Sequence, residues 1–259
     1  MTAALKSHTV DGTLVLSISN PEQRNALSPD MYAAGVEALN AADHNPEIRS
    51  VVLTGEGAHF CAGGNLQRLL ANRQQPPQVQ SDSIENLHNW IETIRSLSKP
   101  VVAAVEGACA GAGFSLVLAC DMVVAAQNSV FVMAYANVGL SPDGGASWSL
   151  MRNMPRATAL QLLMCGDRTD GPRLHQLGVV NRVCEPGQAL AQALDLTATL
   201  NQRAPNSLAS IKELANEALL QPLSHQLRQE RDHFVKNLHH PNGGEGIQAF
   251  LDKRQARYR

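Results

Sequence analysis

Hydrophobic and polar residues follow two different periods along the first two thirds of the chain. Short apolar runs at residues 50–54 and 101–105 predict buried strands. Between such runs, apolar residues recur at helical spacing over residues 83–97, and Ser28 followed by Pro29 is typical of a helix start. Because strand and helix signals alternate up to about residue 185, we predict an α/β fold with largely parallel strands.

The pattern changes after Pro186, where only helical periodicity remains, in residues 188–202, 207–220, 223–239 and 245–258. We therefore expect a core over residues 1–190 and a C-terminal helical region over residues 191–259 that packs on a partner subunit. The polar stretch 71–82, which contains a pair of prolines, predicts a mobile loop within the core.

Composition narrows the class of protein. Of 259 residues, 44% are hydrophobic and 17% are charged, which is typical of a globular protein, and the net charge of −2 argues against nucleic acid or membrane partners. No signal segment and no run of about 18 apolar residues is present. The five cysteines form no CxxC pair, so we expect a cytoplasmic protein without a metal site.

Two turns made of small residues, each between a strand and a helix, are candidates for a functional site. They are GEGAHFCAGGNLQRL at 55–69 and GACAGAGFSLVLACD at 107–121. Neither a dinucleotide fingerprint nor a P-loop is complete in the second turn, which disfavours phosphate binding. Helix starts leave N–H groups unpaired, so two facing turns could stabilise the oxygen of a thioester as it becomes an enolate. Close packing without chemistry is the alternative.

Four blocks of sequence resemble the crotonase, or enoyl-CoA hydratase/isomerase, superfamily: NPEQRNALS (20–28), HFCAGGNL (59–66), KPVVAAVEGACAGAGFSLVLACD (99–121) and VGLSPDGGASW (138–148). The resemblance implies a spiral of β-β-α turns with a C-terminal helical trimerisation region. It also implies a homotrimer or a dimer of trimers, and an acyl-CoA thioester as substrate. No separate cofactor is expected, because coenzyme A is part of that substrate.

The same resemblance implies site residues by position. Gly64 and Ala112 match the two oxyanion-hole donors of the family. The implied contacts to coenzyme A are Arg24, Ala26, Ala62, Asn65 and Leu66, with Phe234 and Lys253 near the adenine and the 3′-phosphate. An apolar acyl pocket would be lined by Leu66, Met133, Tyr135, Leu140 and Trp148, although these residues could equally belong to the core. Lys253 could equally lie on a solvated helix face.

The sequence departs from the hydratase pattern at two positions. Hydratases of this family carry glutamates where this chain has Ser115 and Tyr135, and neither residue is a carboxylate base at neutral pH. One acid remains nearby, Asp143 in a Ser-Pro-Asp-Gly-Gly turn, where turn chemistry alone would explain it. Some isomerases of the family place their single catalytic carboxylate at this position, so we expect Asp143 to be the acid/base.

A single acid/base suits the movement of a proton between two carbons, as in isomerisation of a 3-enoyl-CoA to a 2-enoyl-CoA. A hydratase in which Asp143 positions water stays open, as do thioester hydrolysis or ring opening and a catalytically silent acyl-CoA binder. RNA binding is disfavoured, because the chain has no basic stripe with interleaved aromatic residues.

Overall fold

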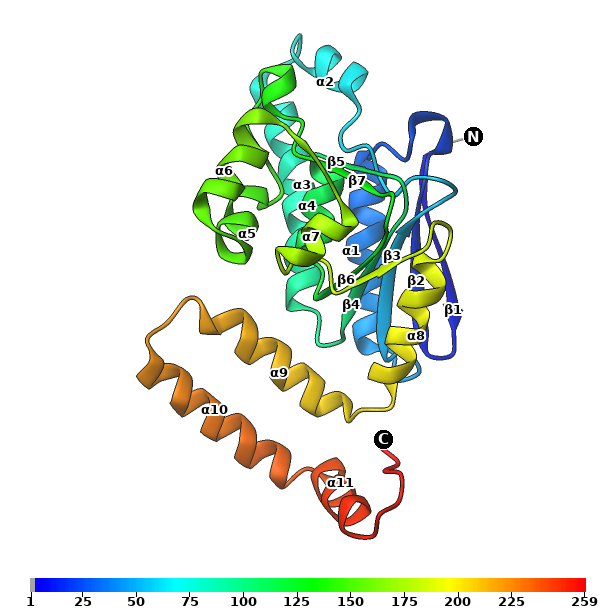
Figure 1. Cartoon of the computed structure of the whole chain (residues 1–259), viewed down its shortest axis with the longest axis vertical. Coiled ribbons are helices and arrows are strands. Elements are labelled where there is room, and N and C mark those ends of the chain that lie inside the picture. Colours follow the sequence, from blue (N-terminus) through cyan, green and yellow to red (C-terminus); the bar gives the residue numbers. More distant parts are fainter. Residues whose placement is uncertain (1–2) are drawn as a thin grey trace.

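A six-stranded sheet forms the centre of the computed structural model, which describes residues 3–259 (Figure 1). Its strand order is β1-β2-β3-β4-β6-β9, and every pair is parallel except the β1–β2 hairpin. The strands are β1 (Ala4–Val10), β2 (Thr13–Ser19), β3 (Ser50–Gly55), β4 (Val101–Val105), β6 (Met122–Ala126) and β9 (Arg182–Cys184). The predicted α/β class with largely parallel pairing is confirmed.

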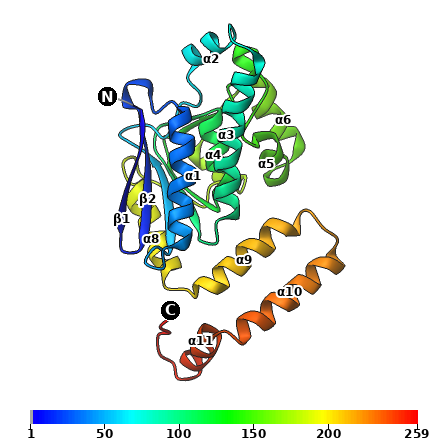
Figure 2. The same cartoon turned by 180° about the vertical axis from the view of Figure 1, so that it is seen from behind.

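Helices cover both faces of this sheet. Side chains of β3 alternate between them: Val51 and Leu53 enter the larger apolar core, whereas Val52 enters a smaller one. The larger core lies under α1 (Pro29–His44), α3 (Pro77–Ser96) and α4 (Ala112–Ala119), and Figure 2 shows α1 and α3 side by side. The smaller core lies under α8 (Ala189–Asn201). Burial on both faces explains why the strands read as continuous apolar runs.

A second sheet of three short strands takes the chain out of the central sheet after β4. It has the order β5-β7-β8, with β5 (Ala108–Ala110), β7 (Val130–Val132) and β8 (Arg168–Asp170). The remaining short elements are η1 (Pro21–Gln23), α2 (Leu66–Asn72), η2 (Ala136–Val138), α5 (Ala146–Asn153), α6 (Arg156–Cys165) and α7 (Gly171–Gln176). The switch from β4 to β5 places the start of α4 at the rim of the core.

The prediction of a mobile loop over residues 71–82 is wrong. Helix α2 extends to Asn72, and α3 already begins at Pro77. The proline pair that suggested a loop is instead the start of α3, because proline fits the first turn of a helix, where its missing N–H is not needed.

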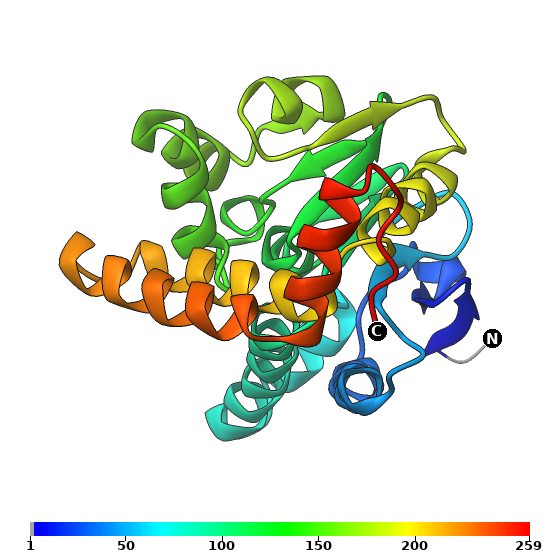
Figure 3. The same cartoon turned by 90° about the horizontal axis from the view of Figure 1, so that it is seen from below.

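Three helices extend beyond the core at the C-terminal end: α9 (Pro205–Ala218), α10 (Leu223–Leu238) and α11 (Pro241–Leu251). Figures 1 and 2 show α9 and α10 lying side by side beneath the core, and Figure 3 shows them from below, in front of it. Helix α8 precedes them in the chain but packs on the central sheet. We refer to α9, α10 and α11 together as the helical arm.

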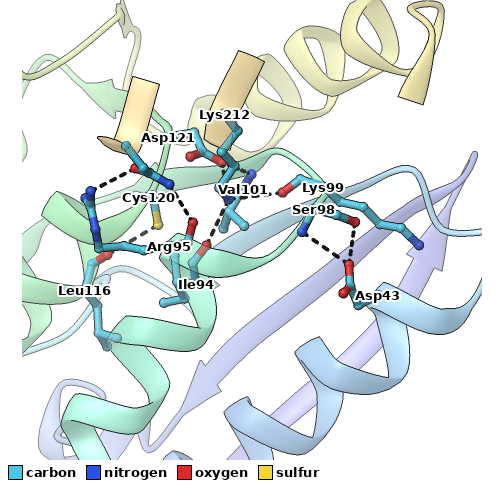
Figure 4. Close-up of polar contacts among 11 residues, drawn as sticks. Asp43, Ile94, Arg95, Ser98, Lys99, Val101, Leu116, Cys120, Asp121 and Lys212 are labelled. Carbon is cyan, nitrogen blue, oxygen red and sulfur yellow. Dashed lines mark hydrogen bonds and ion pairs between the residues drawn. The ribbon is translucent and has the colours of Figure 1, made fainter. Parts of the chain in front are cut away.

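A partly buried ion pair joins the arm to the core (Figure 4). Lys212 of α9 lies 2.8 Å from the Oδ2 atom of Asp121, and its ammonium group also donates to the carbonyl oxygens of Ile94 and Lys99. The same Oδ2 atom accepts the N–H of Val101 at 2.7 Å. Burial raises the pKa of Asp121, and the charge of Lys212 opposes that rise. The pair therefore links α9 to the ends of α3, β4 and α4.

Replacing Lys212 with methionine should lower the free energy of unfolding by about 1–2 kcal/mol, because the partly buried carboxylate of Asp121 loses its ion-pair partner. Urea unfolding measures this change, with Lys236→Met on the exposed surface of α10 as the matched control. Burial raises the pKa of Asp121, so protonation removes the penalty as the pH falls through that value, and the deficit of Lys212→Met should shrink in acid. Equal stability of the two variants at neutral pH would show that the ion pair does not stabilise the fold.

Candidate active site

The two small-residue turns meet in the structure. Residue 61 pairs with β5 in the manner of a neighbouring strand: Cys61 donates its N–H to the oxygen of Ala108 at 3.0 Å and accepts the N–H of Ala110 at 2.8 Å. A Cβ atom on Gly63 would lie 2.7 Å from the Ala110 oxygen and 3.4 Å from the nitrogen of Ala112. Only glycine fits there, because the φ of Gly63 is also +89°.

Packing on the other side of the contact is equally close. A Cβ atom on Gly113, inside the first turn of α4, would come within 2.7–2.9 Å of three atoms of Cys61. The thiol of Cys61 accepts the N–H of Gly63 at 3.3 Å, and burial raises its pKa to about 12. Cys61 is thus a neutral packing and hydrogen-bonding residue rather than a thiolate nucleophile.

The main-chain N–H groups of Gly64 and Ala112 are available as donors. Ala112 is the first residue of α4, where helical geometry provides no acceptor for an N–H group. Within the described part of the chain, residues 3–259, neither of these two groups donates to a protein acceptor. Together with the positive end of the α4 dipole, they can stabilise negative charge on an oxygen placed between them.

Asp143 lies beside the same helix start. The hydroxyl of Tyr135 donates to the Oδ1 atom of Asp143 at 2.6 Å, and the hydroxyl of Ser115 donates to the main-chain oxygen of Asp143 at 3.0 Å. The ring of Tyr135 covers Gly111, the residue before Ala112: a Cβ atom on Gly111 would lie 3.7 Å from its Cζ atom. The carboxylate is therefore held against the turn that presents the Ala112 N–H.

Glycine also sets the approach of the Asp143 loop to α4. A Cβ atom on Gly144 would lie 2.8 Å from the Cβ of Ser115, and the φ of Gly144 is +59°. The N–H of Gly144 points to the Nε2 atom of His88 on α3, at 3.4 Å. The loop is thus fixed between α3 and α4.

Burial keeps the phenols around Asp143 protonated. It raises the pKa of Tyr135, and the negative charge of Asp143 raises it further. Burial also raises the pKa of Tyr32 on α1, with a smaller contribution from Asp143. The hydroxyl of Tyr32 accepts a hydrogen bond from Arg68 of α2 at 3.4 Å. Asp143 thus faces protonated hydroxyl groups on two sides.

The segments expected to surround coenzyme A lie next to the first turn. The N–H of Ala62 donates to the oxygen of Arg24 at 2.9 Å, and the N–H of Leu27, next to the buried Ala26, donates to the oxygen of Gly63 at 2.8 Å. Beyond the turn, Asn65 caps α2 through a bond from the Arg68 N–H, and the side chain of Leu66 is exposed. These predicted residues are brought together with Gly64.

The other predicted residues differ in their surroundings. Trp148 is half-buried, and the guanidinium groups of Arg95 and Arg152 lie 4.6 Å and 4.0 Å from the centre of its ring. Met133 is fully buried in the larger core, and Leu140 is half-exposed near η2. Phe234 lies on α10, and Lys253 follows α11. In Figure 1 these helices lie at the opposite end of the molecule from α2.

Sequence reasoning missed the shared role of Ser115 and Tyr135, which it treated as a core hydroxyl and a pocket wall. Both side chains donate to Asp143. The available signal was their correspondence to the two glutamate positions of hydratases, since a polar side chain at either position faces the same site. Over residues 3–259, no group of His, Cys, Asp or Glu could hold a metal ion, and no described helix is long and apolar enough to cross a membrane.

Comparison with known proteins shows the family to which the chain belongs. The profile of the enoyl-CoA hydratase/isomerase family matches residues 8–259. The 1,2-epoxyphenylacetyl-CoA isomerase of Escherichia coli K12 is 33% identical over 253 residues, which is 97% of each chain. Enoyl-CoA hydratase EchA19 of Mycobacterium tuberculosis is 31% identical over 93% of this chain and 91% of its own.

Solved structures of enoyl-CoA hydratases have the same fold as this chain. The crystal structure of an enoyl-CoA hydratase from Polaromonas sp. JS666 has a TM-score of 0.98 and 67% identity, covering 99% of this chain and 100% of that one. An enoyl-CoA hydratase of Mycobacterium smegmatis has a TM-score of 0.91 at 27% identity, covering 98% of both chains. The chain therefore belongs to the enoyl-CoA hydratase/isomerase family, also called the crotonase superfamily.

Proposed function

We propose that the protein is an enoyl-CoA isomerase in which Asp143 moves a proton between two carbons of an unsaturated acyl-CoA thioester. The observation that carries this proposal is a single carboxylate held by Tyr135 and Ser115 beside the unpaired N–H group of Ala112. The two positions at which hydratases carry glutamates hold hydroxyl groups here. The relative named as an isomerase of an epoxyphenylacetyl-CoA supports a proton-moving role.

The reaction conserves all atoms of the substrate. The Asp143 carboxylate takes a proton from the carbon between the thioester and the double bond of a 3-enoyl-CoA. The released electron pair forms a dienolate, whose oxygen receives hydrogen bonds from the N–H groups of Gly64 and Ala112. Protonated Asp143 then returns the proton two carbons further along, which leaves the double bond conjugated with the thioester.

Assembly into a homotrimer or a dimer of trimers is part of the proposal. The arm exposes large apolar side chains that a partner copy would cover, including Leu223, Leu227, Phe234 and Phe250. Phe234 and Lys253 lie far from the Gly64 turn of their own chain, so we propose that they contact coenzyme A bound to a neighbouring copy (Figure 1).

Hydration is the second candidate, because the 67% identical structure bears the description enoyl-CoA hydratase. In that reaction Asp143 would position a water molecule for addition to the double bond of a 2-enoyl-CoA. The two reactions change the conjugated thioester absorbance in opposite directions: isomerisation of a 3-enoyl-CoA raises it, and hydration of a 2-enoyl-CoA lowers it. Assays with both substrates therefore separate the candidates.

Substituting Asp143 with asparagine should lower kcat for 3-enoyl-CoA isomerisation by a factor of about 10³ or more, because the amide cannot accept the substrate proton. The affinity for a saturated acyl-CoA should change by less than about threefold, since the main-chain donors remain in place. Absorbance kinetics and calorimetric titration measure the two quantities. Full activity of Asp143→Asn would show that another group is the base.

Gly63→Ala should lower kcat by a factor of about 10² or more. The added methyl group would meet the Ala110 oxygen at 2.7 Å and push apart the two turns that present the oxyanion donors. Gly187→Ala is the matched control, because Gly187 has a similar φ of +81° but no neighbouring atom within 4 Å. Both variants bear the strain of a positive φ, and equal losses of kcat in the two would refute the convergence of the turns.

A further inference from the structure

The Tyr135 hydroxyl has no part in the proton transfer described above, yet it makes the shortest contact to the proposed base. It lies 2.6 Å from the Oδ1 atom of Asp143, and it is 3.5 Å from the Oγ atom of Ser115. In residues 3–259, Tyr135 is the one side chain that donates a hydrogen bond to this carboxylate. Within these residues, Oδ1 of Asp143 thus accepts a side-chain hydrogen bond, and Oδ2 accepts none.

We propose that Tyr135 is a positioning residue that fixes Oδ1 of Asp143 as a hydrogen-bond acceptor and leaves Oδ2 as the oxygen that takes and returns the proton. The inference rests on the proposed function and specifies how that site works. A short bond to an ionised carboxylate is strong, and the carboxylate cannot turn without breaking it. The bond of Ser115 to the Asp143 main-chain oxygen, at 3.0 Å, holds the backbone of the same residue.

The geometry ties this orientation to the oxyanion hole. The ring of Tyr135 packs on Gly111, whose neighbour Ala112 presents one of the two N–H donors. The distance between the base and the dienolate oxygen is therefore set through a single turn of chain. Proton transfer to two carbons of one substrate from one oxygen requires that the base keep its place through both steps.

The hydrogen bond depends on the proton of the Tyr135 phenol. Burial raises the pKa of Tyr135, so the phenol stays protonated and remains a donor.

The other groups facing the Asp143 loop are neutral hydroxyls or lie further away. They are Ser115 of α4, Tyr32 of α1 with Arg68 of α2 on its hydroxyl, and His88 of α3, which lies 3.8 Å from Glu85. These groups stay in place in Tyr135→Phe, so a change in the kcat of that variant reports on the phenol.

The test is Tyr135→Phe, which keeps the ring on Gly111 and removes the hydroxyl. The kcat for isomerisation should fall by about 10- to 100-fold, while the dissociation constant of a saturated acyl-CoA stays within about twofold. The KM for the 3-enoyl-CoA should stay within about twofold, so that the loss falls on kcat. Tyr258→Phe, near the C-terminus, is the matched control and should behave as wild type.

A second readout does not depend on isomerisation. Exchange of the α-protons of butanoyl-CoA with D2O, followed by NMR, needs only the base and the oxyanion hole. We expect the exchange rate to fall with Tyr135→Phe by a factor similar to that for kcat. If wild type exchanges these protons but isomerises no 3-enoyl-CoA, the proposed function fails while the role of Tyr135 is still measured.

Replacing the three tyrosines with 3-fluorotyrosine covers the case in which Tyr135→Phe does not fold. Fluorine leaves the hydroxyl in place and makes it a stronger donor, so the bond to Oδ1 persists and kcat should stay within about threefold of wild type. A wild-type kcat in folded Tyr135→Phe, or a loss of more than about tenfold in the fluorinated protein, overturns the proposal. Lower stability with an unchanged kcat would assign Tyr135 a purely structural role.

Discussion

The close approach of residues 61–64 to residues 108–113 is the constraint on which the site depends. Strand-like hydrogen bonds of Cys61 to β5 set the spacing of the two segments. At that spacing no side chain fits at Gly63 or Gly113, because a Cβ atom at either position would collide with the facing segment. Main-chain donors on two separate segments can point at one oxygen only if the segments lie this close.

The two residues that depart from the hydratase pattern, Ser115 and Tyr135, are also the residues that hold Asp143 in place. Carboxylates at positions 115 and 135 would stand within hydrogen-bond distance of Asp143 and repel its charge. Hydroxyl groups at the same positions donate to Asp143 instead. Neutral donors at these two positions therefore suit the proposal that Asp143 is the single base.

The sequence pattern predicted the α/β fold, because strands buried on both faces leave an unmistakable apolar run, as in β3 and β4. The pattern left open whether the turns at Gly64 and Ala112 face each other, which only the family resemblance implied. It did not predict that Ser115 and Tyr135 both donate to Asp143, since those contacts span 28 and 8 residues and depend on how the loop packs against α4. Nor did it predict the two arginines beside Trp148, which come from α3 and α5.

Helix α4 connects the site to the helical arm. Its first residue, Ala112, presents an oxyanion donor, and Asp121, just past its end, holds Lys212 of α9. The helix is only about 12 Å long and every one of its side chains is buried, so neither end can shift while the other stays in place. The ion pair of the arm and the N–H group of Ala112 therefore lie at the two ends of one buried helix. A partner copy that covers the arm would act on a helix that is also part of the active site.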